Sequence, residues 1–108
     1  MLEERKVLKN SELKNGLTLK GDPDSISDMV DDSGKVLQRR VYGKDGRATT
    51  DFDTSNHNRP DLHPTGAHKH TFDYSKKRPR SINIPLTDED LRNNSDIIKR
   101  GENYFDEE

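Results

Sequence analysis

Residues 25–53, SISDMVDDSGKVLQRRVYGKDGRATTDFD, decide the fold because they contain three strand-like runs separated by two turn sequences. The runs cover residues 25–30, 35–42 and 47–53, and the segments between them read DDSG and GKDG. Acidic and glycine residues of this kind are typical of the tight turns that join neighbouring antiparallel strands. The stretch therefore predicts a three-stranded antiparallel meander.

The third run alternates in a way that assigns its side chains to two faces, because side chains two residues apart share a face of a strand. One face carries Arg47, Thr49, Asp51 and Asp53, and the other carries Ala48, Thr50 and Phe52. We expect Asp51 and Asp53 to project together from the polar face of this strand.

Residues 54–67 follow as a loop rich in Asn, Pro, Gly and His, and long loops in small domains are often functional. Residues 68–74 alternate again and predict a fourth strand. Its two faces carry His68, His70, Phe72 and Tyr74 on one side and Lys69, Thr71 and Asp73 on the other. Since aromatic residues continue the histidine face, we expect both imidazoles at the edge of buried surface, within one strand of Asp51 and Asp53.

The flanking segments carry helix signals. Residues 2–13 place Leu and Val among strong helix formers and are followed by Asn15-Gly16, which predicts a short N-terminal helix. Thr87 and the three acids after it resemble an N-cap and a first turn, so we expect a second helix over residues 88–100, after a short extended piece at 81–86. The predicted class is α+β: a three- to four-stranded antiparallel meander sheet with one or two peripheral helices.

Length and composition predict one small domain over residues 1–108, with an N-terminal helix or arm (1–20), a core (21–100) and an acidic tail (101–108). Hydrophobic residues make up 26% of the chain and charged residues 37%, so the core must be thin. The 19 basic and 21 acidic residues nearly cancel, to a net charge of −2. This balance argues against bulk electrostatic attraction to nucleic acid.

Local basic patches remain at residues 76–80 (KKRPR) and at Arg39-Arg40, where the charges either contact a ligand or face solvent. The absence of cysteine excludes disulfides, thiolate metal sites and cysteine nucleophiles. No apolar run approaches the length of a membrane span, and the N-terminus is too polar for a secretory signal. We expect a cytoplasmic or virion-associated protein without membrane contact, or a piece of a longer protein.

One window contains all four histidines: His57, His63, His68 and His70. Imidazole exchanges protons near neutral pH and is the commonest metal ligand in proteins. In a first interpretation the window is a metal-independent ribonuclease site, which needs a base for the 2′-hydroxyl proton, an acid for the leaving oxygen and positive charge near the phosphorus. The strand histidines, a loop histidine, and Arg40 or Lys69 would supply these groups.

Two other interpretations stay open. In one, His68 and His70 point the same way from a strand and bind a divalent metal together with Asp51 and Asp53. In the other, the window is architectural, and its His, Asn and Asp side chains satisfy one another by hydrogen bonds.

A family resemblance is carried by an ordered set of motifs: QRRxY at residues 38–42, DGRA at 45–48, DxD at 51–53, His57, and HPxGxHxH at 63–70. In this order the motifs resemble small domains found in prophage regions, at the ends of phage head-morphogenesis proteins and in bacterial polymorphic toxins. They are similar to toxin domains grouped with the barnase, EndoU, colicin E/D and RelE ribonucleases. The resemblance covers residues 20–100.

This resemblance implies helices packed on an antiparallel sheet whose open face carries the active residues. It also implies metal-independent RNA cleavage, with His68 and His70 as the acid–base pair and Arg40 as the cation. The chain departs from secreted ribonucleases in not being basic.

The leading hypothesis is a ribonuclease-like domain of phage, prophage or polymorphic-toxin type that needs no cofactor. Its candidate catalytic residues are His68, His70, His57, His63 and Arg40. The alternative is a non-enzymatic phage accessory or structural protein, or a His/Asp site that binds a divalent metal. The expected partners are RNA, an immunity protein or phage structural proteins.

Overall fold

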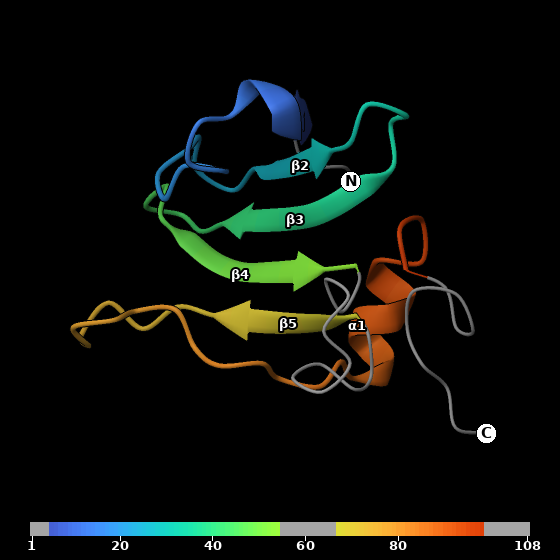
Figure 1. Ribbon diagram of the computed structural model, residues 1–108. Helices are drawn as coiled ribbons and strands as arrows, with labels where there is room; N and C mark the ends of the chain where they lie inside the picture. Colours follow the sequence, from blue (N-terminus) through green and yellow to red (C-terminus); the bar gives the residue numbers. More distant parts are fainter. Residues whose placement is uncertain (1–4, 55–66, 99–108) are drawn as a thin grey trace.

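The computed structural model describes residues 5–54 and 67–98, which form one sheet with a short helix beside it (Figure 1). The elements are β1 (Arg5–Lys9), the 3-10 turn η1 (Asn10–Glu12), β2 (Ile26–Val30), β3 (Val36–Tyr42), β4 (Ala48–Asp53), β5 (His68–Thr71) and α1 (Asp88–Asn93). The strand order is β1-β2-β3-β4-β5, with β1 parallel to β2 and the other pairs antiparallel. The fold is therefore α+β, with a five-stranded mixed sheet.

The N-terminal segment corrects two predictions. Instead of a helix over residues 2–13, the chain forms β1 and the short turn η1, and the sheet is neither purely antiparallel nor limited to four strands. β1 pairs with β2 from Arg5 opposite Ile26 to Lys9 opposite Val30. The edge of β2 that β1 pairs with offers backbone hydrogen bonds along its length. In residues 2–13 the apolar side chains are too sparsely spaced to give a helix a continuous face to bury.

The meander predicted over residues 25–53 is present as β2, β3 and β4. Its second turn also anchors the N-terminal segment, because the Gly21 N–H donates to the Gly46 carbonyl at 2.8 Å. Gly46 has a φ of 80°, and a Cβ placed on it would lie 2.7 Å from the Gly21 oxygen. Only glycine fits this turn without displacing the crossing segment.

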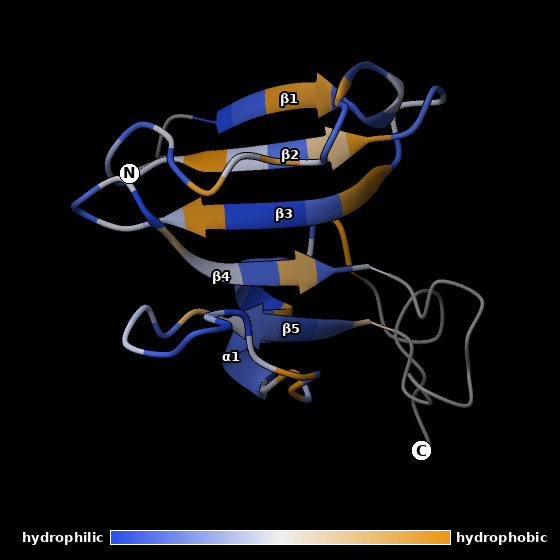
Figure 2. Cartoon of the chain, turned by 60° about the vertical axis from the view of Figure 1, so that its left-hand side comes forward, coloured by the Kyte–Doolittle hydropathy of each residue, from blue (hydrophilic) through white to orange (hydrophobic). Residues whose placement is uncertain are grey.

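One face of the sheet carries the hydrophobic core and packs against the C-terminal part of the described chain. Its core consists of Phe52, Ala67, Leu86 and Ile98, with the partly buried Val41, Leu91 and Ile97 against them. The helix that supplies Leu91 lies beside β5 in both ribbon views (Figures 1 and 2). Lys69, which shares this face with Phe52, reaches Asp90 of the helix at 2.8 Å.

The C-terminal helix is shorter than the predicted 88–100 range. Its start is as expected, with a capping box between Thr87 and Asp90. It ends at Asn93, and the side chains that follow bond to Arg39: the Arg39 Nη1 donates to Asn94 Oδ1 at 3.2 Å and to Asp96 Oδ1 at 3.0 Å. The predicted extended piece, residues 81–86, forms only an isolated bridge between Ile84 and Lys69.

Arg39 joins the sheet to the end of the described chain through ion pairs. Its Nε and Nη2 donate to the two oxygens of Asp28 at 2.8 and 3.0 Å, and its Nη2 also donates to Asp96 at 2.8 Å. Burial alone would lower the pKa of Arg39, but the bonds to Asp28 and Asp96 outweigh it and raise that pKa. The guanidinium therefore stays charged although its side chain is buried.

The opposite face is polar, yet its central residues are buried. Figure 2 shows hydrophilic residues running through the middle of β3, β4 and β5. On this face lie Arg40, Asp51, Asp53, His68 and His70, all of them buried. The ribonuclease resemblance implied an open face here, and the structure corrects that expectation.

Two segments cover the polar face. Residues 17–18 lie over β3, where their carbonyl oxygens accept bonds from Arg40 and Tyr42. The chain after β5 turns back, so that Arg80 and Ser81 lie over β4 and β5. Neither described helix is long and apolar enough to cross a membrane.

Candidate His/Asp site

Asp53, His68 and His70 converge on the polar face of β4 and β5. The strand register places Asp53 opposite His68, and Asp51 opposite His70. The two imidazole Nε2 atoms lie 3.1 Å (His68) and 3.4 Å (His70) from the same oxygen, Asp53 Oδ2. The ring centroids are 5.0 Å apart, with the rings nearly perpendicular. The predicted shared face of the two histidines, one strand from the aspartates, is confirmed.

Bonds from neighbouring elements hold this arrangement. The Gln38 Nε2 of β3 donates to Asp53 Oδ1 at 3.0 Å, which leaves Oδ2 to the imidazoles. His70 Nδ1 lies 2.9 Å from the Ser81 carbonyl oxygen. Because a carbonyl only accepts, Nδ1 carries a proton, and Nε2 is the nitrogen that His70 presents to the site.

Asp53 is held as a carboxylate. Burial alone would raise its pKa, but the bonds from His68, His70 and Gln38 together outweigh burial and hold the pKa well below its usual range. Arg80 adds to this effect from 3.5 Å. The site therefore contains a fixed negative charge that orients both imidazoles.

Asp51, the second aspartate of β4, is fully buried and pairs with arginine instead of histidine. Arg40 Nε and Nη2 donate to its two oxygens at 2.6 and 2.7 Å, and Arg40 Nη1 donates to the carbonyls of Leu17 and Thr18. Burial lowers the pKa of Arg40, but Asp51 outweighs it and raises that pKa. These are the contacts of a structural ion pair, and a catalytic role for Arg40 stays a prediction.

Arg80 is a cation next to the site that sequence reasoning did not single out. Its Nε lies 3.0 Å from Asp51 Oδ2 and its Nη2 lies 3.5 Å from Asp53 Oδ2, while 40% of the side chain is exposed. In the sequence it was only the last member of the KKRPR run. The signal that could have found it is the reversal of the chain between Phe72 and Arg80, which form an antiparallel bridge.

The same three side chains could hold a metal ion. One ligand atom each from Asp53, His68 and His70 lie within 4.8 Å of one another, and all three residues are buried. Nitrogen and oxygen ligands of this kind suit zinc and related divalent metals, and a histidine whose Nδ1 is held by a carbonyl is typical of such sites. Asp51, also a predicted ligand, is instead neutralised by Arg40 and Arg80.

The remaining candidates lie elsewhere. His57 and His63 fall outside the described residues, so their proposed roles stay predictions. Lys69, the alternative cation, projects to the opposite face and pairs with Asp90. No protein-family model, curated protein or solved structure matches this chain significantly.

Proposed function

We propose that the chain is an RNA-cleaving domain of the phage or polymorphic-toxin type, which its sequence motifs resemble, and that Asp53, His68 and His70 form its reactive centre. One observation carries the proposal: two imidazole Nε2 atoms approach one carboxylate oxygen beside a partly exposed arginine, Arg80. Two proton-transfer groups and a cation are the parts that cleavage by an internal 2′-hydroxyl requires.

In this reaction the 2′-oxygen of RNA forms a bond to the adjacent phosphorus while the bond to the 5′-oxygen breaks. Because both imidazoles are buried beneath Arg80 and Ser81, RNA reaches them only when this segment moves aside. One imidazole then takes the 2′-hydroxyl proton and the other, in its protonated form, gives a proton to the departing 5′-oxygen. The products are a 2′,3′-cyclic phosphate and a free 5′-hydroxyl, with no change in oxidation state and no cofactor. Asp53 orients the rings, and Arg80 supplies positive charge to the phosphorane, in the role first predicted for Arg40.

A second candidate function, divalent metal binding, is supported by the clustering of the same ligand atoms. One ligand atom of each ring lies within 4.8 Å of the other and of an Asp53 oxygen. The Ser81 carbonyl accepts a bond from Nδ1 of His70 and so holds that ring in place. Metal ligation would therefore need no rotation of that ring. A bound metal would polarise a phosphate oxygen or activate water, or would only stabilise the fold.

The two candidates separate in one experiment. Single-stranded RNA is incubated with the purified protein in EDTA, and with His68→Gln and His70→Gln variants. Glutamine keeps an N–H donor near the position of Nε2, so the bond to Asp53 is retained while proton transfer is lost. Cleavage by the unmodified protein in EDTA, with a loss of about 100- to 10,000-fold in each variant, is the expected result.

The exposed turn variant Lys35→Gln serves as the control and is expected to cleave RNA normally. Activity that EDTA abolishes and zinc, manganese or magnesium restores would favour the second candidate. No cleavage under either condition by folded protein would contradict both catalytic accounts and favour a binding or virion role. His57→Gln and His63→Gln, assayed alongside, test the roles predicted for these two residues.

A further inference from the structure

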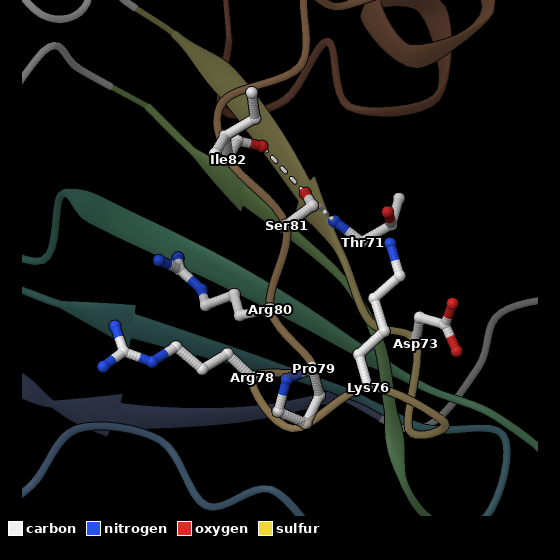
Figure 3. Close-up of a pocket in the computed structure, with 8 residues that line it drawn as sticks. All are labelled: Thr71, Asp73, Lys76, Arg78, Pro79, Arg80, Ser81 and Ile82. Atoms are coloured by element: carbon white, nitrogen blue, oxygen red, sulfur yellow. Dashed lines mark hydrogen bonds between the residues drawn. The ribbon is translucent and has the colours of Figure 1, made fainter.

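A basic pocket lies between the end of β5 and the chain that returns after it. It has a volume of about 440 Å³, and its lining is Thr71, Asp73, Lys76, Arg78, Pro79, Arg80, Ser81 and Ile82 (Figure 3). Three of these residues are cations and one is an acid. Figure 3 shows the side chains of Arg78 and Arg80 extending in the same direction from the loop, with Lys76 on its other side.

The loop that carries these cations is closed by backbone bonds. The Asp73 N–H donates to the Pro79 carbonyl at 2.9 Å, and the Ser81 N–H donates to the Thr71 carbonyl at 2.8 Å. The Lys76 N–H donates to the Asp73 carbonyl at 3.1 Å and forms the turn. The cations are therefore held on a hairpin-like support, which lowers the entropy lost when they bind a ligand.

The charge of the pocket favours an anion. Its three cations outnumber the one carboxylate, Asp73, whose Oδ1 accepts bonds from the Ser75 N–H and hydroxyl at 3.0 and 2.6 Å. Within residues 5–54 and 67–98, Arg78 forms no ion pair, and its side chain is exposed. Arginine presents a planar fork of donors that matches phosphate oxygens.

The pocket and the His/Asp centre share two consecutive residues. Arg80 lines the pocket and also contacts Asp51 and Asp53, while Ser81 lines the pocket and holds His70 through its carbonyl. A phosphate bound in the pocket would thus lie next to the groups proposed to act on RNA.

We propose that this pocket binds the phosphate backbone of single-stranded RNA, through Lys76 and Arg78, and positions the neighbouring nucleotide at the His/Asp centre. The assignment rests on the proposed function for its choice of RNA. The recognised chemistry is phosphate, which a polynucleotide or free phosphate could supply. Backbone phosphates are favoured because the pocket adjoins proton-transfer groups that free phosphate would not use.

The test measures binding alone. The probe is a fluorescent single-stranded 2′-O-methyl RNA oligonucleotide, which cannot be cleaved because its 2′-oxygen carries no proton. Its anisotropy is titrated with the unmodified protein, with Lys76→Ala/Arg78→Ala and with the control Lys9→Ala/Lys35→Ala. The control removes the same charge from exposed positions at the other end of the sheet, where β1 ends and the turn between β2 and β3 lies (Figure 2).

We expect Lys76→Ala/Arg78→Ala to weaken binding by about tenfold or more, and the slope of log affinity against log salt to fall by about 1.4 (roughly 0.7 for each lost phosphate contact on a single strand). The control double variant should change neither quantity to this extent. Lys76→Glu, a charge reversal on the exposed loop, should weaken binding more than Lys76→Ala does.

Equal weakening in the pocket and control variants would overturn the proposal, because attraction would then depend on total charge alone. Polyglutamate competing as well as RNA would overturn it too, as would inorganic phosphate displacing the probe at equal phosphate concentration. Failure of the proposed function looks different: the probe would still bind through the pocket while RNA with a free 2′-hydroxyl stays intact.

Discussion

Arg40 and Asp51 form a bidentate ion pair between β3 and β4, with Nε to Oδ1 at 2.6 Å and Nη2 to Oδ2 at 2.7 Å. Both side chains are buried on the face that also carries Asp53 and the two histidines. The pair therefore stabilises the strands that carry the candidate site. We expect its loss to lower the free energy of unfolding.

Arg40→Met should destabilise the protein by about 3–5 kcal/mol, because it leaves the Asp51 carboxylate buried with one of its two arginine partners removed. Urea unfolding checks this. Lys6→Met, which removes one partner of the exposed Lys6–Asp22 pair, is the control and should cost about 0–1 kcal/mol. Equal effects of the two variants would contradict the structural role given to Arg40.

Arg80→Ala should reduce RNA cleavage by about 100-fold, since it removes the cation proposed to face the phosphorane. Its effect on the free energy of unfolding should stay near 1 kcal/mol, because Asp51 keeps Arg40 and Asp53 keeps Gln38 and the histidines. Steady-state cleavage and urea unfolding are measured together.

Arg92→Ala, on the exposed surface of α1, provides the comparison for Arg80→Ala and should leave cleavage unchanged. Arg80→Lys should recover part of the rate by restoring the charge. A cleavage rate unaffected by Arg80→Ala would remove this arginine from the proposed chemistry.

Zinc should inhibit RNA cleavage when added in slight excess over protein, because it would occupy the imidazole lone pairs that proton transfer needs. The same addition should raise the unfolding temperature, with about 2.7 kcal/mol of stabilisation at a free zinc concentration one hundred times the Kd. EDTA should reverse both effects, and His68→Gln/His70→Gln should abolish the thermal shift. Activation by zinc would reverse the ranking of the two proposed functions.

Acid should weaken the contact between β3 and the end of the described chain. The hydrogen bond from Arg39 lowers the pKa of Asp96 from its ordinary 3.8. A lowered folded-state pKa means that this contribution to stability is present above the ordinary pKa and is lost as pH falls through the folded-state value. Since the Asp96 side chain is about half exposed, solvent screening limits the contribution to roughly 1 kcal/mol or less.

Asp96→Asn isolates the contribution of the Asp96 charge to stability, because asparagine keeps the shape of the side chain and one acceptor while it removes the charge. The stability difference between the unmodified protein and Asp96→Asn should be largest from about pH 5 upward and should shrink as pH falls below the ordinary aspartate pKa. Urea unfolding across this range measures it. A difference that grows as pH falls would contradict the assigned direction.

The candidate site was partly predictable because strand alternation is local. Asp51 and Asp53 are two positions apart, as are His68 and His70, so their shared faces follow from backbone geometry once each segment is a strand. That the two strands would be neighbours was also expected, since consecutive strands commonly pair. The side chain that pairs with each carboxylate could not be predicted from the sequence. Asp51 and Asp53 alternate identically in sequence, yet one lies opposite Arg40 and His70 and the other opposite Gln38 and His68.

The turns after β2 and β3, the alternation of β4 and the capping box at Thr87 were determined by the sequence itself, because each depends on residues a few positions apart. Tertiary structure decided the rest. Residues 5–9 became a strand because β2 had an unpaired edge, and the side chain of Asn94 bonds to Arg39, which lies far away in the chain. Burial of the histidine face and the approach of Arg80 likewise needed segments outside these strands to fold over β3, β4 and β5. Such contacts join residues that are far apart in the sequence, so they form only when the whole chain has packed.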